Sequence, residues 1–461
     1  MQTRTTSIIL VLTAILIVQT SIHAQSNTDT IVSLKDAVRV VITKYHLLQS
    51  KKYEVAAASK NIDVANYSKL PTIDASYQAG FGTANNLTGM FYPGNVLPIT
   101  GPPSSGNNYN PATGSAASIL LNWQAVTFGQ RDAQIAVSVA DANAQIAGYK
   151  QLEFVYSVNV ISKYLDVLLA RDIVDIHQHN IERVQASLNE SKVLTTTGIK
   201  PGVDTALFLS ELSKAKVAWL TAQNRFQTER LLLAQLLVTD KIPRPSDSSF
   251  LNHLPDAYSN KDPSFTDHPS VQLAERQVAL NSAKETALKK SSLPKLSIWG
   301  TVFARGSGFL NDGSIKTWDG LGISRYNYGA GVQIAFPIMK YGEVRRQLQQ
   351  QFMITKAAEE ILLENKAALI IQHRIADASF QNSLAVASEA DAQQKTGLYA
   401  FSAMQTRYNT GLVNFTDLVQ YQYTLLKAEL DVRQAYWGSW KSLLLQAVAK
   451  GDITDFLSEI R

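Results

Sequence analysis

The sequence of 461 residues contains no cysteine. A chain without cysteine cannot be held together by disulfides, and it cannot carry a lipid anchor attached to a thiol. It has five methionines and seven histidines, and these are dispersed rather than gathered at metal-ligand spacing. We therefore expect packing alone to stabilise the fold, with no metal and no cofactor.

Two further absences restrict the function. No glycine-rich loop resembles a phosphate-binding motif, so any energy must come from a partner protein. The chain has 43 basic and 38 acidic residues, scattered rather than gathered in basic tracts, which argues against a nucleic-acid partner. We expect no enzyme activity.

Long hydrophobic runs are missing after the N-terminus. Ile8 to Val18 is an apolar stretch preceded by Arg4 and followed by Ala24, the pattern of a signal peptide over 1–24, cleaved near Ala24. This run is too short for a comfortable transmembrane helix, which needs about 20 residues. We expect an exported protein, with an uncleaved N-terminal anchor as the alternative.

What the sequence does contain is a long repeat. Two segments of equal length, 129–197 and 342–410, are almost free of helix breakers, which predicts helices of about 100 Å at ~1.5 Å per residue. Glycine follows each segment, Gly198 or Gly411, and an aspartate follows each glycine at the same distance. A repeat of this size predicts two long helical hairpins.

The return helices, 203–238 and 415–450, show the spacing of a coiled coil. Apolar and small residues recur every three or four positions, and alanine occupies the same two positions in both copies. The predicted contact positions are Leu418, Tyr421, Leu425, Ala428, Val432 and Ala435, matched by Thr205, Phe208, Leu212, Ala215, Trp219 and Ala222. This spacing predicts tightly packed helices.

Two pairs of predicted strands precede the long helices. Apolar and polar residues alternate in each strand, as in Tyr77 and Gln78, so each strand has one apolar face. The predicted strands cover about 71–82 and 116–127 in the first copy and about 294–305 and 326–337 in the second. The resulting organisation is a first repeat over 25–238, an irregular equatorial connector over 239–267, a second repeat over 268–450 and a tail over 451–461.

These strands have the length and the pattern of membrane strands. About ten residues suffice for a tilted strand to cross a bilayer, with lipid on the apolar side and water on the other. Only helices and closed barrels span lipid, and four strands cannot close. Two chains would supply eight strands, and three would supply twelve with room for a lumen. A soluble sheet with one buried face is the alternative.

A family resemblance follows from the repeated turns. Tyr408-Asn409-Thr410-Gly411 with Asp417, and Thr195 to Gly198 with Asp204, together with the duplicated order of elements, resemble the TolC family of outer-membrane efflux proteins. The resemblance covers essentially the whole mature chain. It implies a mainly α fold with a small β part, forming a homotrimer. A twelve-stranded barrel in outer-membrane lipid would continue into a twelve-helix coiled-coil barrel that spans the periplasm.

The resemblance also implies roles for individual residues. Helical tips of such proteins meet a periplasmic adaptor attached to an inner-membrane pump, which makes Gly198 and Gly411 the adaptor-contacting tip turns. Aspartates near the tips form a periplasmic constriction. The implied gate consists of Asp204 and Asp417, with Lys200, Arg407 and Tyr408 close enough to hold the closed state.

Two departures from the family pattern weaken an ionic lock. Gln420 stands one turn after Asp417, where a second acid often occurs, and Val413 stands where a basic residue can sit. Either aspartate could instead cap the helix that follows it. The expected function is a passive exit duct of a tripartite exporter; the alternative is an exported coiled-coil structural protein without a pore.

Overall fold

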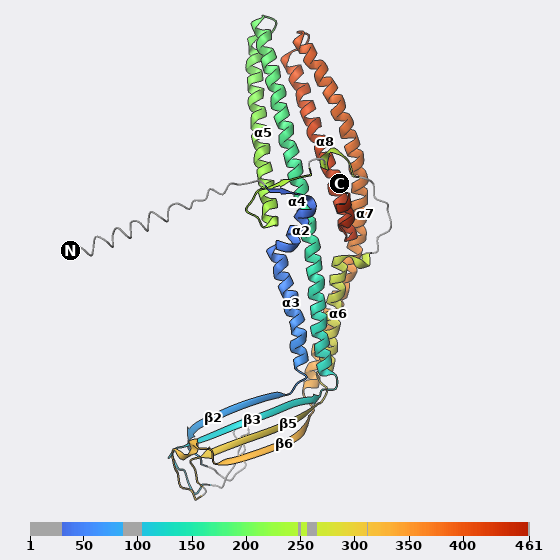
Figure 1. The fold of residues 1–461 in the computed structure, drawn as a ribbon. Coiled ribbons are helices and arrows are strands. Elements are labelled where there is room, and N and C mark those ends of the chain that lie inside the picture. The colour runs from blue at the N-terminus through green and yellow to red at the C-terminus, as the bar shows by residue number, and fades with distance from the viewer. Residues whose placement is uncertain (1–29, 86–103, 248–249, 256–264, 311, 460–461) are drawn as a thin grey trace, which may run out of the picture. The chain divides into compact units, whose positions relative to one another are not determined.

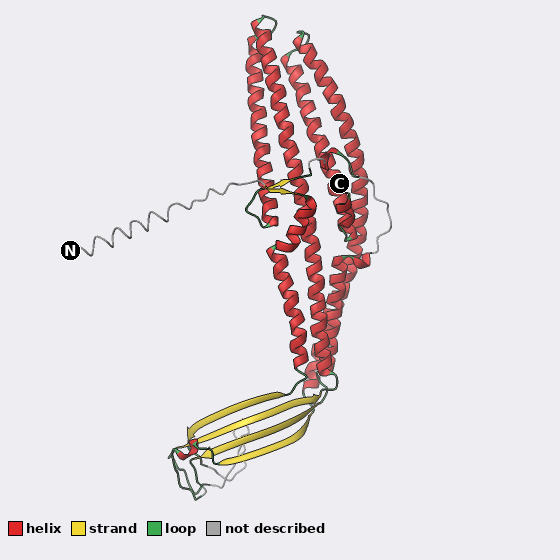
Figure 2. Ribbon diagram, in the orientation of Figure 1, coloured by secondary structure: helices red, strands yellow, loops and turns green. Residues whose placement is uncertain are grey.

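The computed structural model describes residues 30–85, 104–247, 250–255, 265–310 and 312–459. The predicted signal peptide, 1–24, lies outside these residues. Helices form most of the described chain and strands a small part (Figure 2). The predicted mainly helical class with a small β part is therefore confirmed.

The chain divides into two compact units. The helical unit comprises the described residues within 1–52, 149–272 and 365–461, and the sheet unit comprises those within 53–148 and 273–364. Each unit draws on both predicted repeats, because the long helices run from one unit into the other. The sequence repeats are therefore not the compact units.

Four long helices dominate Figure 1. They are α4 (Gln130–Thr196), α5 (Gly202–Leu237), α7 (Lys340–Asn409) and α8 (Phe415–Lys450), each within two residues of the range expected from the repeat. None contains proline, so no backbone N–H is missing from their hydrogen-bond ladders. α8 ends at Gly451 in the left-handed conformation, with φ 79°, as glycine permits.

The shorter helices are α2 (Leu34–Lys44), α3 (His46–Tyr67), α6 (Pro269–Lys290) and α9 (Thr454–Ser458). Ser33 caps α2, because its side chain accepts a hydrogen bond from the Asp36 backbone N–H. α9 lies within the predicted tail, and its Phe456 is fully buried. Part of the tail is thus packed into the core.

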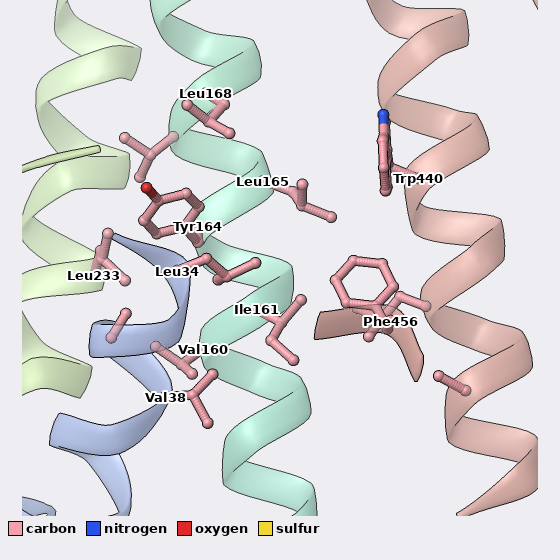
Figure 3. Packing of buried hydrophobic residues seen from close by; sticks show 14 of the residues in the cluster. Leu34, Val38, Val160, Ile161, Tyr164, Leu165, Leu168, Leu233, Trp440 and Phe456 are labelled. Atoms are coloured by element: carbon pink, nitrogen blue, oxygen red, sulfur yellow. The ribbon is translucent and has the colours of Figure 1, made fainter. Parts of the chain in front are cut away.

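The core of the helical unit joins residues that are distant in sequence. Figure 3 shows Leu34 of α2, Tyr164 of α4, Leu233 of α5, Trp440 of α8 and Phe456 of α9 in one hydrophobic cluster. The Trp440 and Phe456 rings meet edge to face with centroids 6.1 Å apart. Burying these large side chains is the main favourable term for this unit.

The predicted coiled-coil spacing is wrong at one position of α8. Leu418, Leu425 and Ala428 are fully buried, but Tyr421 is exposed and Gln422 is buried in its place. The Gln422 side chain hydrogen-bonds Asn180 of α4 at 3.5 Å. Residues three and four positions after Leu418 lie on the same helix face, and the hydrogen bond to Asn180 favours burial of the second of them.

The connector is more ordered than the sequence suggests. It contains β4 (Pro243–Pro245), which pairs in parallel with β1 (Thr30–Val32), and the short helices η1 (Phe250–Asn252) and η2 (Phe265–Asp267). Tyr164 of α4 donates to Asp247 at 2.7 Å, and Arg433 of α8 donates to the Leu251 carbonyl at 2.7 Å. These contacts fix the connector to the long helices.

The sheet unit contains one four-stranded antiparallel sheet in the order β2-β3-β5-β6 (Figure 1). Its strands are β2 (Thr72–Gly82), β3 (Ala112–Val126), β5 (Lys295–Ser307) and β6 (Arg325–Ala335). Strands β2 and β6 form the two edges of the sheet. Each edge strand has a partner on one side only.

The register aligns the apolar faces of all four strands. Ala75 pairs with Ile119, Ile119 with Val302, and Val302 with Tyr328. Side chains of paired residues lie on the same side of a sheet, and Ile119, Val302 and Tyr328 are 54%, 60% and 91% exposed. One face of the sheet is therefore a continuous apolar surface that the single chain leaves open.

Candidate functional site at the helix turns

The two turns predicted as helical tips have the same backbone geometry. Gly198 follows α4 and Gly411 follows α7, with φ of 76° and 81°, values that favour glycine. In each turn the next N–H closes the helix: Ile199 donates to the Leu194 carbonyl, and Leu412 donates to the Arg407 carbonyl, both at 2.9 Å. The sequence repeat is thus a structural repeat at the turns.

Tyr408 forms the centre of the site. Its side chain is fully buried, and its hydroxyl donates to a carboxylate oxygen of Asp204 at 3.1 Å. Asp204 is itself 7% exposed. Burial, together with the negative charge of Asp204, raises the pKa of Tyr408 to about 12. The contact joins the last turn of α7 to the first turn of α5.

Lys200 makes a second bridge between the turns. Its Nζ donates to the Val413 carbonyl at 2.6 Å and lies 4.8 Å from the centroid of the Tyr408 ring. The ammonium group therefore gains a hydrogen bond and a cation–π contact from the second hairpin. Because the acceptor is a backbone oxygen, the absence of a basic side chain at Val413 does not prevent this bridge.

An aromatic cluster surrounds these polar contacts. Phe208 meets Tyr408 edge to face, with ring centroids 5.8 Å apart, and meets Phe415 in the same way at 4.7 Å. The repeat spacing predicts Phe208 as a coiled-coil contact, whereas Phe415 lies outside that spacing. Its apolar character at the start of α8 is a weak signal, since many helices begin this way. The cluster excludes water from the Asp204 contact.

The capping interpretation of the aspartates is wrong. The residue at the N-cap of α5 is Pro201, and that of α8 is Asn414, whose side chain accepts from the Asp417 backbone N–H at 2.9 Å. Asp204 instead accepts a hydrogen bond from another hairpin. Its burial therefore serves a contact between the hairpins.

The structure does not bring every candidate into this cluster. Lys200 and Asp204 each contact Tyr408, whereas Asp417 and Arg407 have exposed side chains. In one chain, these two residues lie at the surface of the turns. Their expected roles at a constriction would depend on neighbouring copies.

Further contacts between the hairpins lie away from the turns. Arg183 of α4 donates two hydrogen bonds to Glu429 of α8, at 2.7 and 2.6 Å. Tyr423 of α8 hydrogen-bonds Glu211 of α5. Sequence reasoning missed these pairs, because no local pattern links residues so far apart in the chain.

Metal and membrane-helix signals are absent from the described ranges. Within them, no group of three or more His, Cys, Asp or Glu side chains could hold a metal ion. Among the same residues, none of the helices has the length and apolarity to cross a membrane.

Part of the chain matches a known protein family. Residues 41–238 match the family model described as outer membrane efflux protein. The resemblance to the outer-membrane efflux family is confirmed. A search of curated proteins finds no match.

Solved structures of transmembrane channels share the fold. CusC superimposes with a TM-score of 0.74 at 14% identity, covering 91% of this chain and 92% of that one. The outer-membrane channel OprN gives 0.70 at 16% identity, covering 91% and 89%. The Campylobacter jejuni CmeC outer membrane channel gives 0.71 at 13% identity, covering 92% and 88%. The described chain therefore shares its fold with these channels over about nine tenths of its length.

Proposed function

We propose that this protein forms a homotrimeric outer-membrane channel, the exit duct of a tripartite efflux or secretion system. One observation carries the proposal. The four-stranded sheet leaves two edge strands with unpaired sides, and its exposed face is continuously apolar. An open sheet edge is not tolerated in lipid, so other copies must complete the sheet.

Three copies complete it best. Eight strands from two copies would enclose an interior filled by side chains, whereas twelve strands from three copies leave room for water. The polar and small face, which includes the hydrogen-bonded pair Ser76 and Ser118, would line that lumen. The long helices of three copies would form the twelve-helix tunnel across the periplasm.

The contacts at the turns support a closed gate. The Tyr408–Asp204 hydrogen bond and the Lys200–Val413 bridge join the two hairpins of one chain. Opening the tip by moving one hairpin away from the other would break both. Asp417 and Arg407 are exposed and would act where copies meet around the pore.

Partners follow from the same arrangement. The turns at Gly198 and Gly411 would contact a periplasmic adaptor, which links the duct to an inner-membrane pump. The duct would be passive, because the sequence offers no phosphate-binding glycine loop of its own. Mature chains would reach the outer membrane after cleavage near Ala24.

The test starts from the full chain expressed with its N-terminal segment. We expect detergent-dependent extraction from outer membranes, a gel mobility that changes on heating, and discrete conductance steps in planar bilayers. Extraction as a soluble monomer without conductance would contradict the channel. That outcome would favour the pore-less coiled-coil protein, which gives no role to the exposed apolar sheet face.

A further inference from the structure

The loop between β5 and β6 folds back onto the sheet. We call its described residues, 308–310 and 312–324, the return loop. Thr113 of β3 donates to the Thr317 carbonyl through both its backbone N–H and its hydroxyl, each at 2.8 Å. The Ser115 hydroxyl donates to the Leu321 carbonyl at 3.3 Å. The return loop is thus hydrogen-bonded to Thr113 and Ser115, two residues of β3 whose side chains point to the same face of the sheet.

The register identifies which face the return loop covers. Ser115 pairs with Gly306, and Ala117 and Ile119 follow Ser115 at alternate positions of β3. Alternate residues of a strand point to the same side. The return loop therefore lies on the apolar face, the one proposed to meet lipid, and not on the face proposed to line the lumen.

Glycine permits the close approach of the two backbones. A Cβ atom at Gly320 would lie 1.7 Å from the Thr113 carbonyl oxygen, and one at Gly306 would lie 1.9 Å from the Gly322 carbonyl oxygen. No side chain fits at either position. The sequence thus has glycine at both positions where the backbone of the return loop contacts the sheet. The contact between the return loop and β3 therefore depends on these two residues.

The outer surface of the return loop mixes aromatic, aliphatic and charged groups. Trp318 is 71% exposed, and its ring stacks on Phe81 of β2 with centroids 6.2 Å apart. Leu321 is exposed as well, and Lys316 lies 3.6 Å from Asp319. An indole beside charged groups is typical of the boundary between lipid chains and head groups.

The position along the strand agrees with that boundary. Trp123 and Thr113 lie on the same face of β3, ten residues apart. At ~3.3 Å per residue and a tilt of about 40°, this distance corresponds to roughly 25 Å across the membrane, the height of an outer-membrane apolar band. The return loop therefore begins where the apolar band ends.

We propose that the return loop is a membrane-interface anchor that inserts Trp318 and Leu321 at the lipid head-group boundary of the outer leaflet. This inference rests on the proposed barrel. The partner is the lipid surface, recognised through the indole ring, the aliphatic side chain and the flanking charges. The return loop thereby fixes the depth of the barrel in the membrane.

Single spin labels test the anchor, because the chain has no cysteine of its own. Trp318→Cys, Ile119→Cys and Ser118→Cys would each be labelled in the full-length protein. The labelled proteins would be reconstituted in vesicles of phosphatidylethanolamine and phosphatidylglycerol. Collisions with oxygen report lipid, and collisions with a water-soluble nickel chelate report water. We expect position 119 to report lipid, position 118 water and position 318 an intermediate depth.

The outcomes separate the two proposals. Lipid exposure at 119 with full water exposure at 318 would overturn the anchor and leave the barrel intact. Water exposure at 119 would overturn the barrel, and the anchor with it.

A glycine pair supplies the matched control. Gly320→Ala should displace the return loop and move the label at 318 into water without changing the label at 119. Gly322→Ala should leave both unchanged, since its Cβ would lie 3.5 Å from the nearest carbonyl oxygen. If the label at 318 has the same depth in Gly320→Ala as in Gly322→Ala, the anchor does not depend on the contact between the return loop and β3, and the proposal is wrong.

Discussion

At the residue scale, Tyr408 makes a buried polar contact between the two hairpins, and we propose that this contact holds the gate closed. Its hydroxyl has one charged acceptor, Asp204, in a site that aromatic rings shield from water. A hydrogen bond to a charged group contributes about 1.5–3 kcal/mol. Separating the hairpins would expose both groups to water, so the contact favours the closed arrangement until another interaction compensates for its loss.

The raised pKa of Tyr408 predicts a pH dependence. The folded value is about 12 and the ordinary value 10.0. The stabilising effect of the neutral phenol is therefore complete below about pH 10 and is lost as the pH rises to about 12. We expect the thermal stability of the wild type to fall more steeply over this window than that of Tyr408→Phe. Parallel curves would show that Tyr408 does not titrate as its burial implies.

Substitution of either aspartate should raise single-channel conductance, but only substitution of Asp204 should change the pH response of Tyr408. Asp204→Ala removes the acceptor of Tyr408 and should raise single-channel conductance, because the hairpins separate more easily. Asp417→Ala removes an exposed negative charge from the proposed constriction and should also raise single-channel conductance. Because Asp417 does not contact Tyr408, this variant should leave the pH response of Tyr408 unchanged. Planar bilayer recordings at neutral and alkaline pH measure both. Unchanged conductance in both variants would remove the aspartates from the gate.

At the element scale, the hairpins are joined along their lengths as well as at the turns. Arg183 of α4 and Glu429 of α8 form two hydrogen bonds, with side chains 20% and 15% exposed. A bidentate pair of this kind fixes the orientation of both side chains. It therefore holds the axial register of α8 against α4.

Removing this pair should weaken the helical unit. We expect Arg183→Ala to lower the free energy of unfolding by about 1.5–3 kcal/mol, because Glu429 loses its charged partner. Lys395→Ala is the matched control, since Lys395 pairs with Asp391 while 75% exposed and should cost at most about 1 kcal/mol. Denaturant unfolding of both variants measures the difference. Equal losses would mean that the half-buried Arg183–Glu429 pair stabilises the fold no more than an exposed pair does.

At the scale of the whole molecule, the proposed channel requires neighbouring copies to close the sheet into a barrel. The apolar face includes Tyr328 of β6, and the opposite face includes its neighbour Asn327. Completion of the barrel would place the first against lipid and the second in the lumen. A single chain cannot satisfy both surroundings.

This arrangement predicts alternating chemical access along β6. In membrane-inserted protein, Asn327→Cys should react with a water-soluble maleimide, and Tyr328→Cys should react only with a lipid-soluble one. The native chain, which lacks cysteine, is the blank for both reagents. Equal reaction of both positions with the water-soluble reagent would argue that the sheet is not the wall of a membrane barrel.

The local patterns of the chain were informative about elements. The breaker-free segments gave the long helices within two residues, because helix ends depend on local glycine turns such as Gly198 and Gly411. Alternation in the strands gave the apolar face, since the side-chain period of a strand is fixed. The heptad failed at Tyr421, because the adjacent Gln422 is buried instead and hydrogen-bonds Asn180 of α4.

The sequence by itself determined the helical hairpins, the strand faces and the family resemblance, because each rests on periodicity over neighbouring residues. Only the tertiary structure decided that Lys200 reaches the Val413 carbonyl, that Arg183 pairs with Glu429, and that the return loop covers the apolar face. These contacts join residues that are far apart in the chain. Their partners are selected by the packing of complete elements, which no local pattern encodes.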